Sequence, residues 1–173
     1  MTTEAAFDEM FRRFEPNVYA YCARRFSPSL AEDVTAEVFG IAWAKFDDAP
    51  FGGEALPWLY RIAFLTASNQ RRRLGARRRY EEGFSPIRRT TAVSDHVVVR
   101  DELRAVLDGL ERLRSKDQEV LRLAAWEGLE TSEIATVLGV KPDAAAQRLH
   151  RARERLAREV ASRTGGRRRR AVR

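Results

Sequence analysis

The stretch LETSEIATVLGVKPDAAAQRLHRARERL, residues 129–156, decides the fold of the C-terminal part of the chain. Ile134, Ala135 and Leu138 are spaced i, i+1 and i+4, which predicts one apolar face of a short helix. Gly139 follows where a glycine in the left-handed conformation commonly closes a helix. Pro142 fits the first position of a second helix, because that position needs no N–H donor. The stretch therefore predicts two helices around a tight turn, a helix-turn-helix.

The second of these helices has an apolar side and a largely cationic side. A buried stripe is predicted at Ala145, Leu149, Ala152 and Leu156. At about 100° per residue, the opposite side carries Asp143, Gln147, His150, Arg151 and Glu154, with Arg148 beside them. Such a helix presents the side chains of its N-terminal half to base edges in the major groove of DNA. A solvated basic helix is the alternative, but the preceding helix and the glycine turn favour DNA binding.

Two kinds of DNA contact are expected from this helix. We expect base contacts from Gln147, His150 and Arg151, because Gln pairs well with adenine and Arg with guanine. Phosphate contacts are expected from Arg148, Arg153 and Arg155, and these set register and salt dependence without reading sequence.

Length and composition set broad limits on the protein. At 173 residues and 44% hydrophobic content, the chain can bury the core of one ordinary domain or of two small ones. No apolar run approaches the roughly eighteen residues of a membrane span, and MTTEAAFDEM lacks a signal pattern, so we expect a cytoplasmic protein. Cys22 is the single cysteine, which excludes an internal disulfide and a cysteine zinc cluster.

Charge is divided unevenly along the chain. The net charge is +7 and the pI is about 10.3, which favours a polyanionic partner. Residues 1–60 nevertheless hold ten acids against five cations, a balance of −5, so the remainder carries +12. The acidic residues 1–60 suit a protein partner, whereas the basic remainder of the chain suits nucleic acid.

Helical periodicity extends through most of the remaining sequence. Helices are predicted over 7–26, 30–46 and 55–74, with a bend or break at Pro16. A further helical block begins near Asp95, and Ser115 to Gln118 has the form of a capping box. Residues 75–97 lose apolar periodicity and predict a linker, and residues 161–173 predict a disordered basic tail.

Two aromatic features of the front part are candidate contact surfaces. Phe39 and Trp43 lie four residues apart among acids, which is typical of a docking surface, although both could equally be core. Trp58 and Tyr60 precede a run of arginines, an arrangement that suits stacking on unpaired bases, and here too simple packing is an equal alternative.

The order of these segments resembles the extracytoplasmic-function class of bacterial sigma factors, from about Phe7 to Leu156. AEDVTAEVFGIAWAKF (31–46) is similar to the family's helix that grips the clamp helices of the largest RNA polymerase subunit. PWLYRIAFLTASNQRRR (57–73) is similar to the segment that melts and reads the minus-ten element. DQEVLRLAAWEGLETSEIATVLGVKPDAAAQRLHRAR (117–153) resembles the module for the minus-thirty-five element.

The resemblance implies an all-α protein with two small helical domains joined by a flexible linker. Region 2 would span 5–74 and region 4 would span 98–160, with the linker over 75–97. Implied partners are core RNA polymerase, through its clamp helices and flap, and promoter DNA. Whether an anti-sigma factor is a further partner stays open, and no cofactor, metal or membrane is implied.

The resemblance also implies site residues for each contact. The core-polymerase contacts would be Asp33, Glu37, Phe39 and Trp43, with Ala36 where glutamine is usual. The minus-ten contacts would be Trp58, Arg61, Leu65, Asn69, Arg71, Arg72 and Arg73. The minus-thirty-five contacts would be Lys141, Asp143, Gln147, Arg148, His150, Arg151 and Arg153. Leu65 stands where asparagine is common, so the family's minus-ten preference does not transfer.

Two other functional classes were weighed against the sequence. A stand-alone transcriptional regulator would keep the helix-turn-helix and use residues 1–74 for dimerisation or ligand sensing; it would bind duplex DNA without polymerase. Catalysis is not expected, because His96 and His150 are the only histidines and lie at a linker edge and in a basic helix. Asp47 and Asp48 are adjacent acids in a Pro-Gly loop, a pattern more typical of solvated residues than of a metal site.

Overall fold

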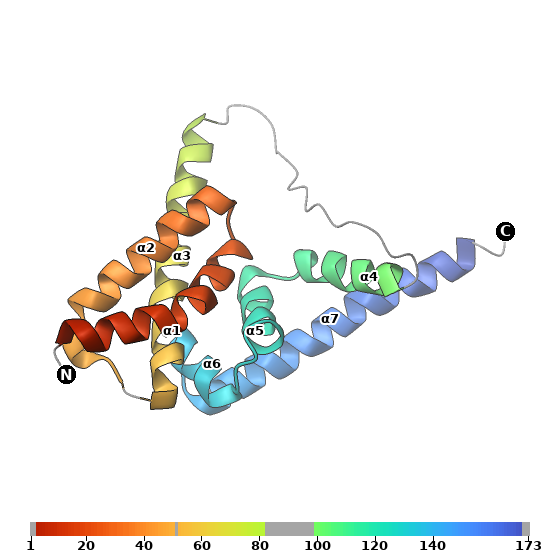
Figure 1. The fold of residues 1–173 in the computed structure, drawn as a ribbon. Helices are drawn as coiled ribbons and strands as arrows, with labels where there is room; N and C mark the ends of the chain where they lie inside the picture. Colours follow the sequence, from red (N-terminus) through yellow and green to blue (C-terminus); the bar gives the residue numbers. More distant parts are fainter. Residues whose placement is uncertain (1–2, 51, 82–98, 171–173) are drawn as a thin grey trace. The chain divides into compact units, whose positions relative to one another are not determined.

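The computed structural model describes residues 3–50, 52–81 and 99–170 (Figure 1). Within these residues the regular structure is entirely helical, which confirms the predicted all-α class. The chain divides into two compact units. The first is Met1–Pro86 with Ser132–Val140, and the second is Ile87–Thr131 with Lys141–Arg173. None of the described helices combines the length and the hydropathy needed to cross a membrane.

Three helices form the body of the first unit: α1 (Thr3–Ala23), α2 (Pro28–Ala44) and α3 (Ala55–Glu81). Each packs against the other two. Their core contains fully buried side chains from all three helices: Val18, Tyr21, Cys22, Val34, Val38, Leu59 and Ala63. The rings of Tyr21 and Tyr60 lie 5.5 Å apart in this core. Burying each large side chain contributes about 1.5–3 kcal/mol, so the predicted apolar stripes are what hold the bundle together.

Pro16 does not break α1, contrary to the predicted interruption. The helix is continuous from Thr3 to Ala23 with Pro16 inside it. Met10 and Val18 lie on either side of the proline and are both buried, so packing holds both halves of the helix against the core. Pro16 itself is exposed, where water can bond the carbonyl left without an N–H partner.

The second helix begins and ends two residues earlier than predicted. Ser27 is its N-cap and Pro28 occupies the first turn, but the Ser27 side chain makes no capping hydrogen bond. After Ala44 the chain forms two short 3-10 turns, η1 (Phe46–Asp48) and η2 (Gly52–Glu54). Gly52 has φ 69°, which explains a glycine at that point of the connection.

The third helix is longer than its apolar pattern predicts. It continues through residues 75–81, the start of the predicted linker, and residues 82–98 lie outside the described part of the chain. Arginine is a good helix former, so the arginine-rich segment extends the helix although it adds no apolar stripe.

The second unit is built on α7 (Pro142–Arg170). Both α4 (Val99–Arg112) and α5 (Ser115–Ala125) pack against α7. Buried residues of the three helices form the core: Leu110, Val120, Leu123, Ala145, Leu149 and Ala152. Gly109 allows a close approach of α4 to α7, because a Cβ there would lie 3.2 Å from a methyl carbon of Leu156. The helix-turn-helix stripe is thus buried as predicted, except that Leu156 is half-buried.

The predicted capping box at Ser115 is wrong. Arg114 is the N-cap of α5, and it makes no side-chain capping bond. Gln118 instead donates from Nε2 to the carbonyls of Leu113, at 2.9 Å, and Glu111, at 3.1 Å. Its amide therefore stabilises the turn between α4 and α5.

The predicted disordered tail is helical over most of its length. Residues 161–170 continue α7, and residues 171–173 lie outside the described residues. High helix propensity and a favourable interaction of arginine with the C-terminal helix dipole both support this extension.

Candidate nucleic-acid interface

The predicted turn of the helix-turn-helix has a defined backbone geometry. The helix α6 (Thr131–Leu138) ends at Gly139, whose φ of 65° is left-handed. The Val140 N–H donates to Ala135 O at 3.0 Å, and the Gly139 N–H donates to Thr136 O at 3.2 Å. This pair of bonds is the Schellman motif, which satisfies two carbonyls at the helix end. The role predicted for Gly139 is confirmed.

Arg61 contacts the same helix end within the first unit. Its Nη1 donates to Val137 O at 3.0 Å, another carbonyl that has no partner inside the helix. The guanidinium also fills the space beside Gly139, because a Cβ added there would lie 2.6 Å from Arg61 Nη2. Arg61 is half-buried, so in this structure the predicted DNA contact acts as a C-terminal cap for α6.

The outward side of α7 carries most of the predicted DNA contacts. Lys141, directly before α7, is exposed, and the exposed residues of the helix's first half include Asp143, Gln147, His150, Arg151 and Arg153. Arg148 is half-buried. His150 and Glu154 approach to 3.5 Å, with 74% and 55% of their side chains exposed. The helix therefore offers hydrogen-bonding groups along one open face, as a reader of the major groove requires.

Arg155 makes an ion pair within the second unit that the sequence did not predict. Its Nη1 donates to Asp117 Oδ2 on α5 at 2.6 Å, and the Asp117 side chain is only 7% exposed. A buried carboxylate needs a partner, because desolvating an unpaired charge costs several kcal/mol, to order of magnitude. Arg155 therefore joins α5 to α7 through this ion pair.

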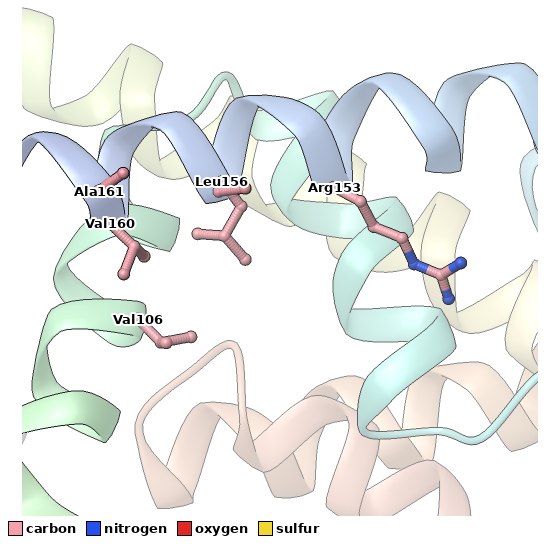
Figure 2. Close-up of a pocket in the computed structure, with 6 residues that line it drawn as sticks. Val106, Arg153, Leu156, Val160 and Ala161 are labelled. Atoms are coloured by element: carbon pink, nitrogen blue, oxygen red, sulfur yellow. The ribbon is translucent and has the colours of Figure 1, made fainter.

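An apolar groove runs between α4 and α7. It is lined by Val106, Arg153, Leu156, Ala157, Val160 and Ala161 (Figure 2). Leu103 and Val106 on α4 are 49% and 38% exposed. Figure 2 shows Val106 facing Leu156 and Val160 across the groove, with Arg153 farther along α7. Arg153 therefore lies where the groove meets the outward side of α7.

The predicted minus-ten residues of α3 differ in exposure: Leu65, Asn69, Arg72 and Arg73 are exposed, and the others are half-buried. Leu65 is 45% exposed, and Asn69 accepts a hydrogen bond from the Arg72 guanidinium. Trp58 and Arg71 are half-buried, while Arg73 is exposed. Tyr60 is only 2% exposed, so it packs in the core and does not present its ring for stacking on an unpaired base.

The residues of α2 that were predicted to dock a protein differ in how deeply they are buried. Asp33 and Glu37 are exposed, and Trp43 is 46% exposed. Phe39 is only 4% exposed, so its ring packs in the core, the alternative that its sequence pattern also allowed. One helical step of four residues advances by about 40°, which is enough to take Trp43 out of the core that holds Phe39.

Sequence reasoning missed two aromatic residues of α1 beside this surface. Phe11 is 40% exposed, and its ring lies 4.7 Å from that of Phe39. Phe7 packs edge-on against Trp43 at 4.9 Å. Periodicity assigned both to a helix face, but it could not show that α1 and α2 place their outer aromatics together.

Known proteins match both the sequence and the fold. A family model described as sigma-70, region 4 matches residues 103–156. The RNA polymerase sigma factor CarQ of Myxococcus xanthus is 30% identical over 155 residues, covering 87% of each chain. NccH of Alcaligenes xylosoxydans xylosoxydans, also named an RNA polymerase sigma factor, is 30% identical over 87% of this chain and 84% of its own.

Solved structures share the arrangement of helices. CnrH, solved in complex with the cytosolic domain of CnrY, aligns over 92% of this chain and 90% of its own, with a TM-score of 0.62 and 26% identity. RpoE of Bartonella quintana, solved with the anti-sigma factor NepR, aligns over 90% and 97% with a TM-score of 0.70; at 22% identity it supports the fold. On the evidence of these sequences and helices, the chain belongs to the extracytoplasmic-function class of RNA polymerase sigma factors.

Proposed function

We propose a division of labour within this sigma factor. Residues 5–74 bind core RNA polymerase and engage the minus-ten element, and residues 98–160 read the minus-thirty-five element. The protein acts in the cytoplasm, and its own side chains supply binding energy without catalysing a reaction.

The observation that carries this proposal is the exposed side of α7. Gln147, His150 and Arg151 are exposed directly after a confirmed helix-turn-helix turn, while Ala145 and Leu149 are buried behind them. These exposed groups match the amide, imidazole and guanidinium donors that read base edges. Residues 103–156, the stretch matched by the sigma-70 region 4 model, include this surface.

The minus-ten element is assigned to the solvent side of α3. Trp58 supplies an aromatic surface, and Arg71, Arg72 and Arg73 supply positive charge farther along the same helix. Unstacking a base costs a few kcal/mol, to order of magnitude, and stacking and phosphate contacts offset that cost. Leu65 offers an exposed apolar surface in the same region, so contacts at Leu65 would rest on shape rather than on hydrogen bonding.

Two further surfaces of this protein are proposed to contact polymerase. The acidic face of α2 suits the clamp helices, and the apolar groove between α4 and α7 suits the flap. RpoE and CnrH were each solved with a protein bound, NepR in the first case and the CnrY cytosolic domain in the second. By analogy, an anti-sigma factor is proposed as a further partner of this chain.

Transcription from matched promoters tests the division of labour. Core polymerase with this protein would transcribe a cognate promoter and two derivatives, one with a replaced minus-ten element and one with a replaced minus-thirty-five element. Arg151→Ala should weaken the cognate promoter and the minus-ten derivative, yet have little further effect when the minus-thirty-five element is already replaced. Arg112→Ala, an exposed arginine of α4, is the control. Equal loss on all three templates would contradict the assignment.

A further inference from the structure

An exposed leucine lies in the middle of a polar row on α3. The residues Trp58, Arg61, Leu65, Asn69 and Arg72 follow one another at steps of three and four, which places them along one side of the helix. Leu65 is 45% exposed, and the buried residues of α3 do not cover it. Its methyl groups are therefore open to an apolar group of a ligand.

Asn69, one helical turn after Leu65, has an amide that is held in one orientation. The side chain is exposed, and its Oδ1 accepts a hydrogen bond from the Arg72 guanidinium. Because a guanidinium carries donors and no acceptor, it holds the amide oxygen toward Arg72 and directs the Nδ2 donors away from it. Residues four apart on a helix have Cβ atoms about 5–6 Å apart, so Asn69 can present a donor beside the methyl groups of Leu65.

An apolar group beside a hydrogen-bond donor matches one DNA base. Thymine carries a methyl group at C5 next to an acceptor, O4, on the same edge. Cytosine has an amino donor in place of O4, which would set donor against donor, and neither purine has a methyl group on that edge. The pair formed by Leu65 and Asn69 is thus complementary to thymine.

We propose that Leu65 and Asn69 together read a thymine of the minus-ten element. Leu65 contacts the C5 methyl group, and Asn69 Nδ2 donates to O4. This inference rests on the proposed minus-ten contact of α3 and adds to it the base that two of its residues select.

Binding of base analogues by the full-length protein with core polymerase tests the inference. The probe is a cognate promoter duplex with a non-complementary bubble over the minus-ten element, so that a base can be replaced without changing its pairing. Each thymine of the bubble is replaced in turn by deoxyuridine, which lacks only the methyl group, and by 5-methyldeoxycytidine, which keeps the methyl group but has an amino donor in place of O4. At one thymine, deoxyuridine should weaken binding about three- to fourfold, and 5-methyldeoxycytidine about tenfold or more.

Two variants assign the two parts of this preference. Leu65→Ala should bind the thymine and deoxyuridine probes equally, because it has no methyl groups to lose contact with. Asn69→Ala should lose most of the penalty for 5-methyldeoxycytidine while it keeps the response to deoxyuridine. Trp126→Ala removes a side chain that is 39% exposed in the second unit, so it is the control and should respond to both analogues as the wild type does.

The outcomes separate this inference from the proposed function. Binding that requires the minus-ten sequence but tolerates deoxyuridine at every thymine would overturn the thymine contact while the proposed function stands. A cognate minus-ten element without thymine, or a wild-type response to deoxyuridine in Leu65→Ala, would overturn it in the same way. If replacing the whole minus-ten element leaves binding unchanged, the proposed function of α3 fails and the inference fails with it.

Discussion

At the scale of single residues, Phe39 and Trp43 are both aromatic but differ in burial, and this difference should decide how much each contributes to stability. Phe39→Ala should lower the free energy of unfolding by about 3–5 kcal/mol, because it opens a cavity beside the rings of Phe7 and Phe11. Trp43→Ala should cost about 1–2 kcal/mol, since nearly half of its surface already meets water. Chemical denaturation of the two variants measures both values. Equal losses of stability would contradict the different burial of the two rings.

Arg151 and Arg148 differ in the kind of DNA contact expected from them. Arg151→Ala should cost about 1–3 kcal/mol of discrimination at one base pair of the minus-thirty-five element. Arg148→Ala should weaken all promoters alike and reduce the salt slope of binding by about 1. Binding of the holoenzyme to single-substitution promoters over a salt series measures both effects. Identical profiles for the two variants would refute the distinction between base and phosphate contacts.

Arg155 should behave as a structural residue. Arg155→Ala leaves the buried Asp117 carboxylate without its partner, so we expect a loss of about 1–2 kcal/mol of unfolding free energy, moderated by the partial exposure of Arg155. Denaturant unfolding and a salt series of promoter binding give the two readouts. A lower salt slope with unchanged stability would instead return Arg155 to the phosphate contacts.

At the scale of elements, the turn after α6 depends on a glycine for two reasons. In Gly139→Ala, the alanine must adopt a left-handed φ, and its Cβ must displace the Arg61 guanidinium. The variant should therefore lose about 1–3 kcal/mol of unfolding free energy. Gly40→Ala is the matched comparison, and it should raise stability by about 0.5–1 kcal/mol because Gly40 lies in an open helix interior. Thermal unfolding should therefore show a lower midpoint temperature for Gly139→Ala and a higher one for Gly40→Ala than for the wild type. A change in the same direction for both variants would contradict this account.

Elements with strong local signals could be predicted from the sequence. Gly139 and Pro142 mark the two sides of the turn. The helix predicted over 55–74 is present, and its buried residues Leu59, Ile62, Ala63 and Thr66 recur with a helical period. The errors arose where tertiary contacts override local rules. Pro16 stays inside α1 because the core holds both sides of it, and Gln118 closes a turn where a capping box was expected.

The sequence predicted the part of the candidate site that depends on one helix alone, and missed the part that depends on contacts between helices. Helical phase placed Gln147, His150 and Arg151 on the exposed side of α7, which depends on one helix alone. The burial of Phe39, the exposure of Phe11 and the pairing of Arg155 with Asp117 each depend on a second helix. A single-helix pattern carries no information about those neighbours.

At the scale of the whole molecule, the charge split corresponds to two kinds of partner. Residues 1–60 carry −5 and the remainder carries +12, so the acidic part suits a protein partner and the basic part suits DNA phosphates. A chain with both surfaces should select promoters only when polymerase holds it, since each DNA contact alone is small.

The most direct test of this account compares promoter binding by the protein alone and with core polymerase. Fluorescence anisotropy would follow a labelled cognate duplex and a scrambled duplex at physiological salt. We predict weak binding of both duplexes by the protein alone, and tight binding of the cognate duplex with transcription once core polymerase is added. Tight, sequence-specific binding by the protein alone, unchanged by core polymerase and without transcription, would contradict the central claim.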